Sequence, residues 1–391
     1  MSERSLRGKA AIIGVGETKY YKRGQSPDTE FKLALEAILT ACEDAGISPK
    51  EIEGFSAFSN ESSNPNRMAT ALGLPELKFS AMAWSGGGGG GSAAAASAAA
   101  GIAGGMADVV VVFRSLTQGA QRLGGAGYAG SVSTDAHYRT SYGVISPAQQ
   151  YVMRVVRYMH DHGIGQEALR AIAMASYHHA QTNPDAVMYG KPLTAEAYDA
   201  SRWIVEPFHL YDCCMENDGA AAYVMVSAER AKTAKRKPVY LLGAAQGSEF
   251  RNQAAALNAP LLGSAGFTTV APRLYEMAKV RPQDLDVIQV YENFTGGVLL
   301  AMAEHGLFKP EEANAVLTLE NLTVGGRLPL NTSGGNLAHC YMHGMEHHIE
   351  AVRQLRGEAR NQVAGAKRAL VVSGPMVSPT SSMILGSEEA L

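Results

Sequence analysis

Histidines are concentrated in one short segment near the C-terminus, where they could bind a metal or line a site. His339, His343 and His347 recur every four residues, so a helix would place them on one face with Glu346 beside them. Imidazole and carboxylate groups on one face are ligands that Zn²⁺ uses. No second element with clear ligands accompanies them. We therefore expect these histidines to line a pocket, and we predict no metal.

A run of glycines, Gly86 to Gly91, stands directly before an alanine-rich segment of high helix propensity. Backbone N–H groups at a helix N-terminus favour negative charge, so this run suits an oxygen atom that carries or develops negative charge. The missing side chains also leave room for a bulky substrate. Close packing of a central helix against a strand or another subunit explains the glycines equally well, and both roles are compatible.

Four cysteines are present, and their spacing fits neither a disulfide framework nor a CxxC metal pair. Cys213 and Cys214 are adjacent, whereas Cys42 and Cys340 stand far apart. We expect free cysteines in a reduced, cytoplasmic setting. Cys213 and Cys214 are expected to behave as small apolar residues rather than as nucleophiles.

The composition indicates a large folded core and excludes a broad nucleic-acid-binding surface. The chain has 391 residues, of which 46% are hydrophobic, and its formal net charge is −3. The first ten residues carry no apolar signal core, and residues 86–105 are too rich in glycine and alanine to read as a membrane span.

Alternating strand-like and helix-like segments predict an α/β protein. Residues 9–18 read as a buried strand, 31–46 as an amphipathic helix and 48–58 as a turn and strand, which together make a βαβ unit. The alanine-rich helix leads into a second strand at 107–113. From 115 to 216 the pattern is irregular, which predicts a loop domain that helps to form the site.

An internal repeat divides the chain into two similar halves. Residues 49–55 and 282–288 share a proline, an aliphatic residue and an acid in the same order, and 85–113 has a counterpart in 333–373. We predict an N-terminal half at 1–114 plus 217–235, a loop domain at 115–216 and a C-terminal half at 236–391. A ligand is expected where the strand ends of both halves converge.

Several motifs resemble the thiolase superfamily over nearly the whole chain. They are GVGET near the start, NDGAAAYVMVS at 217–227 and NTSGGNLA at 331–338; the run from TNPDA to NDGAAA looks like the sterol-carrier or lipid-transfer-protein branch. The resemblance implies an α/β thiolase fold, in which two similar βαβαβαββ halves form a five-layer αβαβα sandwich with an inserted loop domain.

The catalytic groups that the resemblance leads one to expect are replaced here. The nucleophilic cysteine position falls on Gly88, and the histidine of the Gly-His motif becomes Tyr341. The asparagine of the Asn-Glu-Ala-Phe loop becomes Tyr291, and the second cysteine falls near Ser373 or Gly374. Thiolase chemistry is therefore not expected.

Two tyrosines at converging thiolase positions resemble the steroid side-chain-cleaving aldolases of the lipid-transfer-protein type. That resemblance implies retro-aldol cleavage of a β-hydroxyacyl-CoA steroid to a ketosteroid and a short acyl-CoA such as propionyl-CoA. It also implies no cofactor beyond the coenzyme A of the substrate, a homodimer, and a zinc-ribbon and OB-fold partner protein in a heterotetramer.

Retro-aldol cleavage needs a base for the hydroxyl proton, a group that holds the enolate and an acid for the new carbanion. An ordinary tyrosine has a pKa of about 10, so it donates a proton readily and accepts one only with help. We assign Tyr341 as the main acid/base and Tyr291 as its partner, without deciding which removes the hydroxyl proton. The expected substrate or acyl-CoA contacts are Gly86, Gly87, Gly88, Glu292, Asn293, His339 and His343.

Two other functions stay open from the sequence. A non-catalytic acyl-CoA or lipid carrier would bind tightly without turnover and would tolerate loss of either tyrosine hydroxyl. An acetyl-CoA acyltransferase would need a thiol nucleophile, for which Cys213 or Cys214 would be the candidates.

Overall fold

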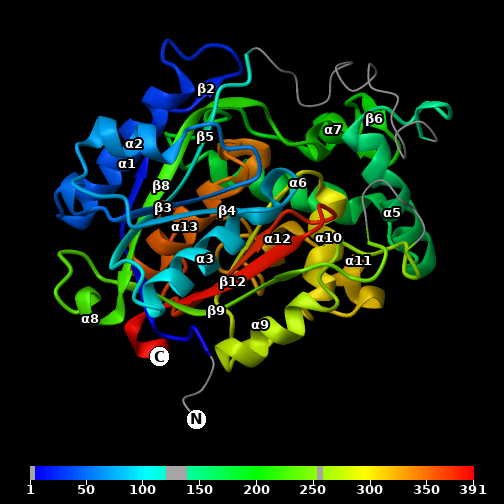
Figure 1. The fold of residues 1–391 in the computed structure, drawn as a ribbon. Coiled ribbons are helices and arrows are strands. Elements are labelled where there is room, and N and C mark those ends of the chain that lie inside the picture. The colour runs from blue at the N-terminus through cyan, green and yellow to red at the C-terminus, as the bar shows by residue number, and fades with distance from the viewer. Residues whose placement is uncertain (1–4, 120–138, 253–258) are drawn as a thin grey trace.

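The computed structural model describes residues 5–119, 139–252 and 259–391 (Figure 1). Its main sheet runs in the order β10-β11-β12-β9-β1-β8-β5-β3-β4, with β2 paired to β8. The strands of this sheet are β1 Ala10–Glu17, β2 Tyr21–Lys22, β3 Gly54–Phe58, β4 Phe79–Ala83, β5 Val109–Leu116, β8 Asn217–Ser227, β9 Val239–Gly247, β10 Val287–Val290, β11 Arg368–Ser373 and β12 Thr380–Gly386.

Two similar groups of strands make up this sheet. In the first, β3 runs parallel to β4 and β5, while β8 is antiparallel to β5 and β1. In the second, β10 is parallel to β11, and β12 is antiparallel to β11 and β9. Among the described strands, the two groups are joined by the pairing of β1 with β9, at Ala11–Tyr240 and Ile12–Val239. The predicted mixed α/β architecture is confirmed.

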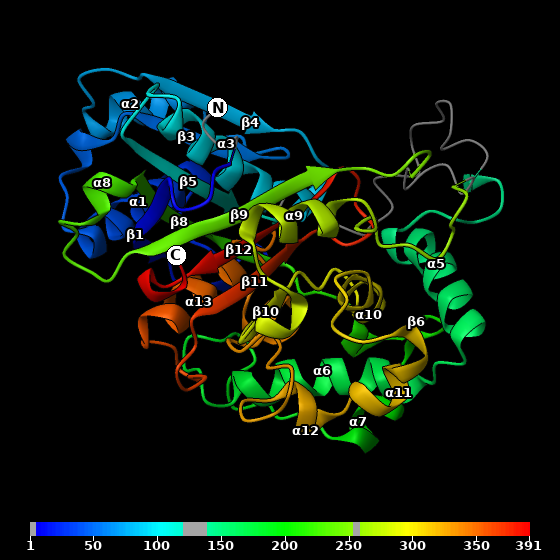
Figure 2. The same cartoon turned by 90° about the horizontal axis from the view of Figure 1, so that it is seen from below.

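Helices separate and cover the two groups of strands (Figure 2). α3 (Gly91–Ala103) contacts strands of both groups, and α13 (Met345–Arg356) packs beside it against β8, β10 and β11. α1 (Glu30–Ala45) covers the outer face of the first group, and α9 (Val270–Ala278) covers that of the second. Alanines on α3 are buried on both sides, so small side chains let a helix lie between two layers of strands.

The repeated sequence pattern folds into the same element twice. Pro49–Glu51 and Pro282–Asp284 are both single 3₁₀ turns, and a fully buried parallel strand follows each of them, β3 in one half and β10 in the other. In both turns proline stands at the start and an acid closes the turn by accepting a backbone N–H bond.

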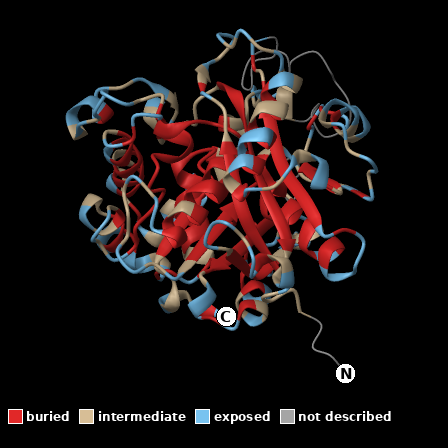
Figure 3. Cartoon of the chain, turned by 90° about the vertical axis from the view of Figure 1, so that its left-hand side faces the viewer, coloured by how far each residue is buried: buried red, intermediate tan, exposed pale blue. Residues whose placement is uncertain are grey.

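The chain between β5 and β8 leaves the sheet and returns to it. It contains α5 Pro147–His162, α6 Gln166–Ala180, α7 Ala195–Asp199, β6 Trp203–Val205 and β7 Phe208–His209. Leu116 at the end of β5 pairs with Gly219 near the start of β8, so both ends of the insertion lie at one place. Figure 3 shows the buried sheet and central helices against more exposed outer segments.

Of the remaining helices, α10 (Thr295–Glu304) is buried in the C-terminal half and the others are short. These others are α2 Pro65–Leu72, α8 Ala228–Ala231, α11 Ala313–Val316 and α12 Leu319–Leu322. Across the described ranges, no helix combines the length and the apolar character needed to cross a bilayer.

Candidate active site

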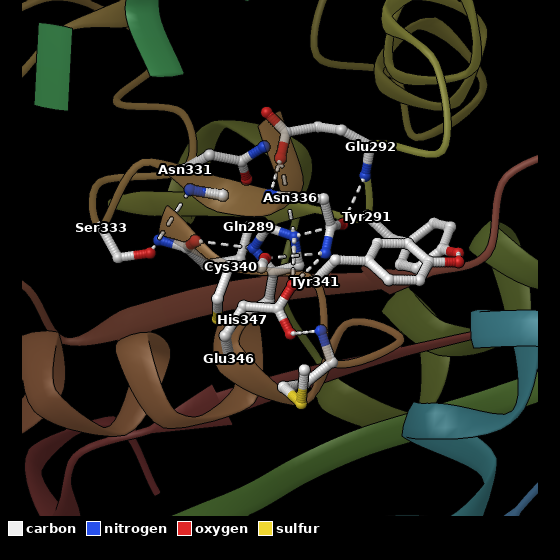
Figure 4. Close-up of polar contacts among 12 residues, drawn as sticks. Gln289, Tyr291, Glu292, Asn331, Ser333, Asn336, Cys340, Tyr341, Glu346 and His347 are labelled. Carbon is white, nitrogen blue, oxygen red and sulfur yellow. Dashed lines mark hydrogen bonds and ion pairs between the residues drawn. The ribbon is translucent and has the colours of Figure 1, made fainter. Parts of the chain in front are cut away.

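Two tyrosine hydroxyls meet in the core. Tyr291 directly follows β10, and Tyr341 lies just before α13; their hydroxyl oxygens are 2.8 Å apart (Figure 4). Asn331 holds the end of β10, because its side chain accepts a hydrogen bond from the N–H of Val290 (2.7 Å) and donates one to the carbonyl of Val290 (2.9 Å). The backbone N–H of Tyr341 donates to the side-chain oxygen of Asn217 at 3.0 Å. Asparagine side chains therefore anchor the backbone at or next to each tyrosine.

Both hydroxyls keep their protons at neutral pH. Burial raises the pKa of Tyr291 and of Tyr341 well above 10. A base at this site must therefore gain help from the substrate or from a proton passed between the hydroxyls. Their direct hydrogen bond provides a path for that proton.

A network of buried polar groups lies next to the tyrosines, with Asn336 at its centre (Figure 4). The N–H of Asn336 donates to Glu292 Oε2 at 2.6 Å, and the N–H of Glu292 donates to Asn336 Oδ1 at 2.9 Å. The side-chain amide of Asn336 donates to Glu346, and Ser176 Oγ donates to Glu292 Oε1 at 2.5 Å. These bonds hold the loop after β10 against the segment that carries Tyr341.

The two carboxyl groups of this network are adjacent to a histidine but do not form an ordinary ion pair with it. His347 Nε2 lies 3.8 Å from Glu292 and 3.9 Å from Glu346. Burial raises the pKa of Glu292 to about 7 and that of Glu346 well above its usual value, and it lowers the pKa of His347 to about 3. The histidine is neutral, so it gives the tyrosines no nearby cation.

The Glu292→Gln variant is expected to gain stability relative to wild type as pH rises from about 4.5 to 8. The wild-type carboxyl group ionises near 4.5 when unfolded but stays protonated to about pH 7 when folded. Its stabilising contribution is therefore complete below about 4.5 and is lost as pH rises through about 7, by about 3 kcal/mol. Urea unfolding of both proteins across this range measures the difference, and a difference that is constant with pH would contradict the prediction.

The glycine run lies against the tyrosines over part of its length. Gly87–Gly90 forms a 3₁₀ turn, and α3 begins at Gly91. A Cβ at Gly88 would lie 2.4 Å from the ring of Tyr291, whereas one at Gly86 would meet Val377 instead. The structure therefore brings Gly88, with Gly87 beside it, to the tyrosine pair, and it directs Gly86 toward another turn.

The loop residues Glu292 and Asn293, predicted as substrate contacts, both hydrogen-bond to other groups of the protein. Glu292 points into the Asn336 network. Asn293 donates its side-chain N–H to the carbonyl of Pro375 at 2.8 Å, and its side-chain oxygen accepts from the N–H of Phe294. Both residues anchor the loop that carries Tyr291.

The prediction that the histidines share one helical face is wrong. Residues Gly335–His339 form a π-helical turn, His343 has a left-handed backbone with φ 51°, and α13 begins only at Met345. Among the described residues, no three His, Cys, Asp or Glu side chains are grouped so as to hold a metal ion. The histidines are instead distributed over three environments.

His339 and His343 pack against different tyrosines. His339 packs its ring edge-on against Tyr20, with the ring centroids 5.5 Å apart, and burial lowers its pKa. His343 packs perpendicular to Tyr341, with centroids 5.1 Å apart, and its Nδ1 accepts a hydrogen bond from Arg114. Of the two predicted histidines, His343 is the one in contact with the tyrosine pair.

The thiols near the site are held in their neutral form. Burial raises the pKa of Cys213 to about 12 and that of Cys214 well above its usual value. Cys214 is close enough to the tyrosines that ionisation of its thiol would raise the pKa of both. Neither environment activates a nucleophile.

Two residues of the site were missed by sequence reasoning. Asn336 lies within the NTSGGNLA motif, but its role as a link between two acids depends on residues far away in the chain. Arg114 had a visible signal, since it is a cation at the end of an otherwise apolar strand. A charge in such a position needs buried partners.

The fold and the site define a thiolase-like protein in which paired tyrosines stand where a cysteine-based site would be. Residues 247–387 match the family described as Thiolase C-terminal domain-like. A Mycobacterium smegmatis SCP2-thiolase-like protein has the same fold, with a TM-score of 0.72 and 21% identity over 97% of this chain and 77% of that one.

More similar relatives place the chain within this superfamily. It is 38% identical to a steroid side-chain-cleaving aldolase of Thermomonospora curvata, over 98% of this chain and 99% of that one. It is also 38% identical to the 17-hydroxy-3-oxo-4-pregnene-20-carboxyl-CoA lyase of Mycobacterium tuberculosis, over 97% and 100%. A solved Ltp2-ChsH2(DUF35) aldolase superposes with a TM-score of 0.91, at 36% identity over 98% and 99%. The chain belongs to the thiolase superfamily, in the branch of the steroid side-chain-cleaving aldolases, and the predicted resemblance is confirmed.

Proposed function

We propose that this chain is an aldolase that cleaves the side chain of a β-hydroxyacyl-CoA steroid into a ketosteroid and a short acyl-CoA such as propionyl-CoA. The observation that carries the proposal is the buried pair of hydroxyls of Tyr291 and Tyr341, 2.8 Å apart. The two relatives with 38% identity are named for this class of reaction and substrate, and they match over their whole length. The high pKa of Cys214 disfavours the acyltransferase alternative.

The two hydroxyls can carry both proton transfers of the reaction. One tyrosine oxygen accepts the proton of the tertiary hydroxyl while its own proton moves along the hydrogen bond to the other tyrosine, the C–O bond becomes a carbonyl, and the C–C bond breaks. The electron pair of that bond passes to the acyl-CoA fragment as an enolate. In the same relay the second tyrosine gives its original O–H proton to the enolate carbon, so each tyrosine ends with one proton, as it began. Over the whole reaction the two tyrosines neither gain nor lose a proton. The coenzyme A of the substrate is the only cofactor that the proposal requires.

The test is conversion of 17-hydroxy-3-oxo-4-pregnene-20-carboxyl-CoA by the purified chain, co-expressed with a DUF35 partner. Formation of ketosteroid and propionyl-CoA in equal amounts is expected, measured by liquid chromatography with mass detection. Tight binding of the substrate without any product would favour the carrier function instead.

We propose a heterotetramer of two copies of this chain and two of a zinc-ribbon and OB-fold partner, in a cytoplasmic setting. One solved relative, the Ltp2-ChsH2(DUF35) aldolase, is named with a DUF35 component, which supports a partner of that kind. Strand β4 ends the sheet path of the described residues, and Met82 and Trp84 at this edge are 52% and 86% exposed, which supports pairing of two copies there. Light scattering is expected to give twice the 41.4 kDa of one chain for the protein without its partner.

A further inference from the structure

Arg114 is a buried cation that is aimed at the site. Its side chain and that of Glu61 are each 1% exposed, with Nη1 3.2 Å from the carboxylate of Glu61. Nη2 donates to Asn60 at 2.8 Å, and Nε donates to Nδ1 of His343 at 3.1 Å. A buried arginine is costly unless its donors are satisfied, and here one of them is satisfied by a histidine at the tyrosine pair.

The contact with Arg114 determines the tautomer of His343. Arginine carries only donors and keeps its charge, so Nδ1 of His343 must accept, and the ring proton must be on Nε2. Burial, together with the charge of Arg114, lowers the pKa of His343 well below 6.5. The ring is therefore a neutral Nε2–H donor, and the cation at Nδ1 polarises it and strengthens that donor.

The ring of His343 lies against Tyr341 of the tyrosine pair. The ring is in perpendicular contact with Tyr341, and the carbonyl oxygen of His343 would be 2.8 Å from a Cβ on Gly88. Within the described part of the chain, Nε2 of His343 has no hydrogen-bond partner. It is nevertheless not fully sealed from solvent. The backbone of His343 is held in the left-handed region, which is uncommon for histidine and is found at functional sites.

We propose that the Nε2–H of His343 donates a hydrogen bond to the thioester oxygen of the substrate, and that Arg114 is a positioning residue that holds the donor in this tautomer. This inference rests on the proposed aldolase function. A neutral imidazole is suited to the role, because it stabilises negative charge on oxygen without transferring its own proton.

This hydrogen bond strengthens as the reaction proceeds. When the C–C bond breaks, its electron pair moves into the enolate, and the thioester oxygen gains negative charge. The donor is already in place, so its contribution is larger in the transition state than in the bound substrate. Protonation of the enolate carbon by tyrosine returns the oxygen to a carbonyl, and His343 is unchanged at the end.

The decisive comparison is between His343→Phe and His343→Gln in the complex with the DUF35 partner. Phenylalanine keeps a ring beside Tyr341 but removes the donor, so kcat is expected to fall about 100-fold with little change in KM. Glutamine can place an amide N–H near the position of Nε2, so kcat is expected to stay within about tenfold of wild type. Both variants have a side chain in the same left-handed conformation, so backbone strain is matched.

Arg114→Gln tests the positioning role. Loss of the cation is expected to lower kcat at unchanged KM, and in ¹⁵N spectra of histidine-labelled protein the His343 signals are expected to shift from one tautomer to a mixture. Wild-type kcat and a single Nε2–H tautomer in this variant would overturn the role of Arg114.

Failure of this inference is distinguishable from failure of the aldolase function. If wild type does not cleave the steroid acyl-CoA, the proposed function fails. If wild type cleaves it and His343→Phe does so at the same rate, or if the glutamine and phenylalanine variants lose activity equally while they retain wild-type melting temperatures, the donor role of His343 is overturned.

Discussion

Replacing Tyr341 with phenylalanine is expected to lower kcat for side-chain cleavage by about 1,000-fold, with little change in KM. The variant keeps the ring that packs against His343 but loses the hydroxyl that lies 2.8 Å from that of Tyr291. General acid–base catalysis by a positioned side chain contributes about 10²- to 10⁴-fold, and here one hydroxyl serves two proton transfers. Single-turnover measurements with the steroid acyl-CoA separate this chemical step from product release.

Tyr223→Phe is the matched control for this experiment. Tyr223 is another fully buried tyrosine, whose hydroxyl lies 3.1 Å from Nδ1 of His348 in the central layer rather than at the tyrosine pair. Its loss is expected to cost stability, about 1 kcal/mol, and to leave kcat near wild type. A Tyr341→Phe enzyme that turns over as fast as this control would rule out the acid/base role.

Gly88→Ala is expected to reduce cleavage at least 100-fold in a protein that still folds. The added Cβ would stand 2.4 Å from the ring of Tyr291 and 2.8 Å from the carbonyl oxygen of His343, so one of them must move. Displacement of a catalytic group by about 1 Å can cost a factor of about 100. Steady-state kinetics together with the melting temperature separate a displaced site from an unfolded chain.

Gly91→Ala is the control within the same glycine run. Its Cβ would lie 3.1 Å from His348 Nε2 and 3.2 Å from Ser373 Oγ, both atoms near the ends of side chains. Gly91 is helical, so alanine suits its backbone conformation. We expect activity within about threefold of wild type, and an equal loss in both variants would mean that the run is sensitive to any side chain.

Local patterns in the sequence were sufficient for the framework of the fold. Apolar runs predicted β1 and β5, and the repeated proline–acid pattern predicted equivalent turns before β3 and β10, because each of these signals lies within a few residues. The tyrosine pair was identified only through resemblance to a family, since nothing local to Tyr291 or Tyr341 distinguishes them from ordinary core tyrosines.

The rest of the site depends on backbone geometry and distant contacts. Histidines at every fourth position suggested one helix, but the left-handed backbone at His343 and Gly344 interrupts it, and periodicity alone does not reveal such a break. Arg114 meets a histidine 229 residues further along the chain. A single sequence contains no record of that pairing.

The insertion between β5 and β8 begins and ends at neighbouring, hydrogen-bonded positions of one sheet. A segment attached in this way can be lengthened, shortened or exchanged for that of a relative without any change in strand register, because closing a longer loop adds little entropic cost. The elements that carry Tyr291 and Tyr341 lie outside it. Chimeras joined at Leu116 and Gly219 that keep a serine and an asparagine at the positions of Ser176 and Asn217, which support Glu292 and Tyr341, would therefore change which molecules reach the tyrosines while the same bond-breaking machinery is kept.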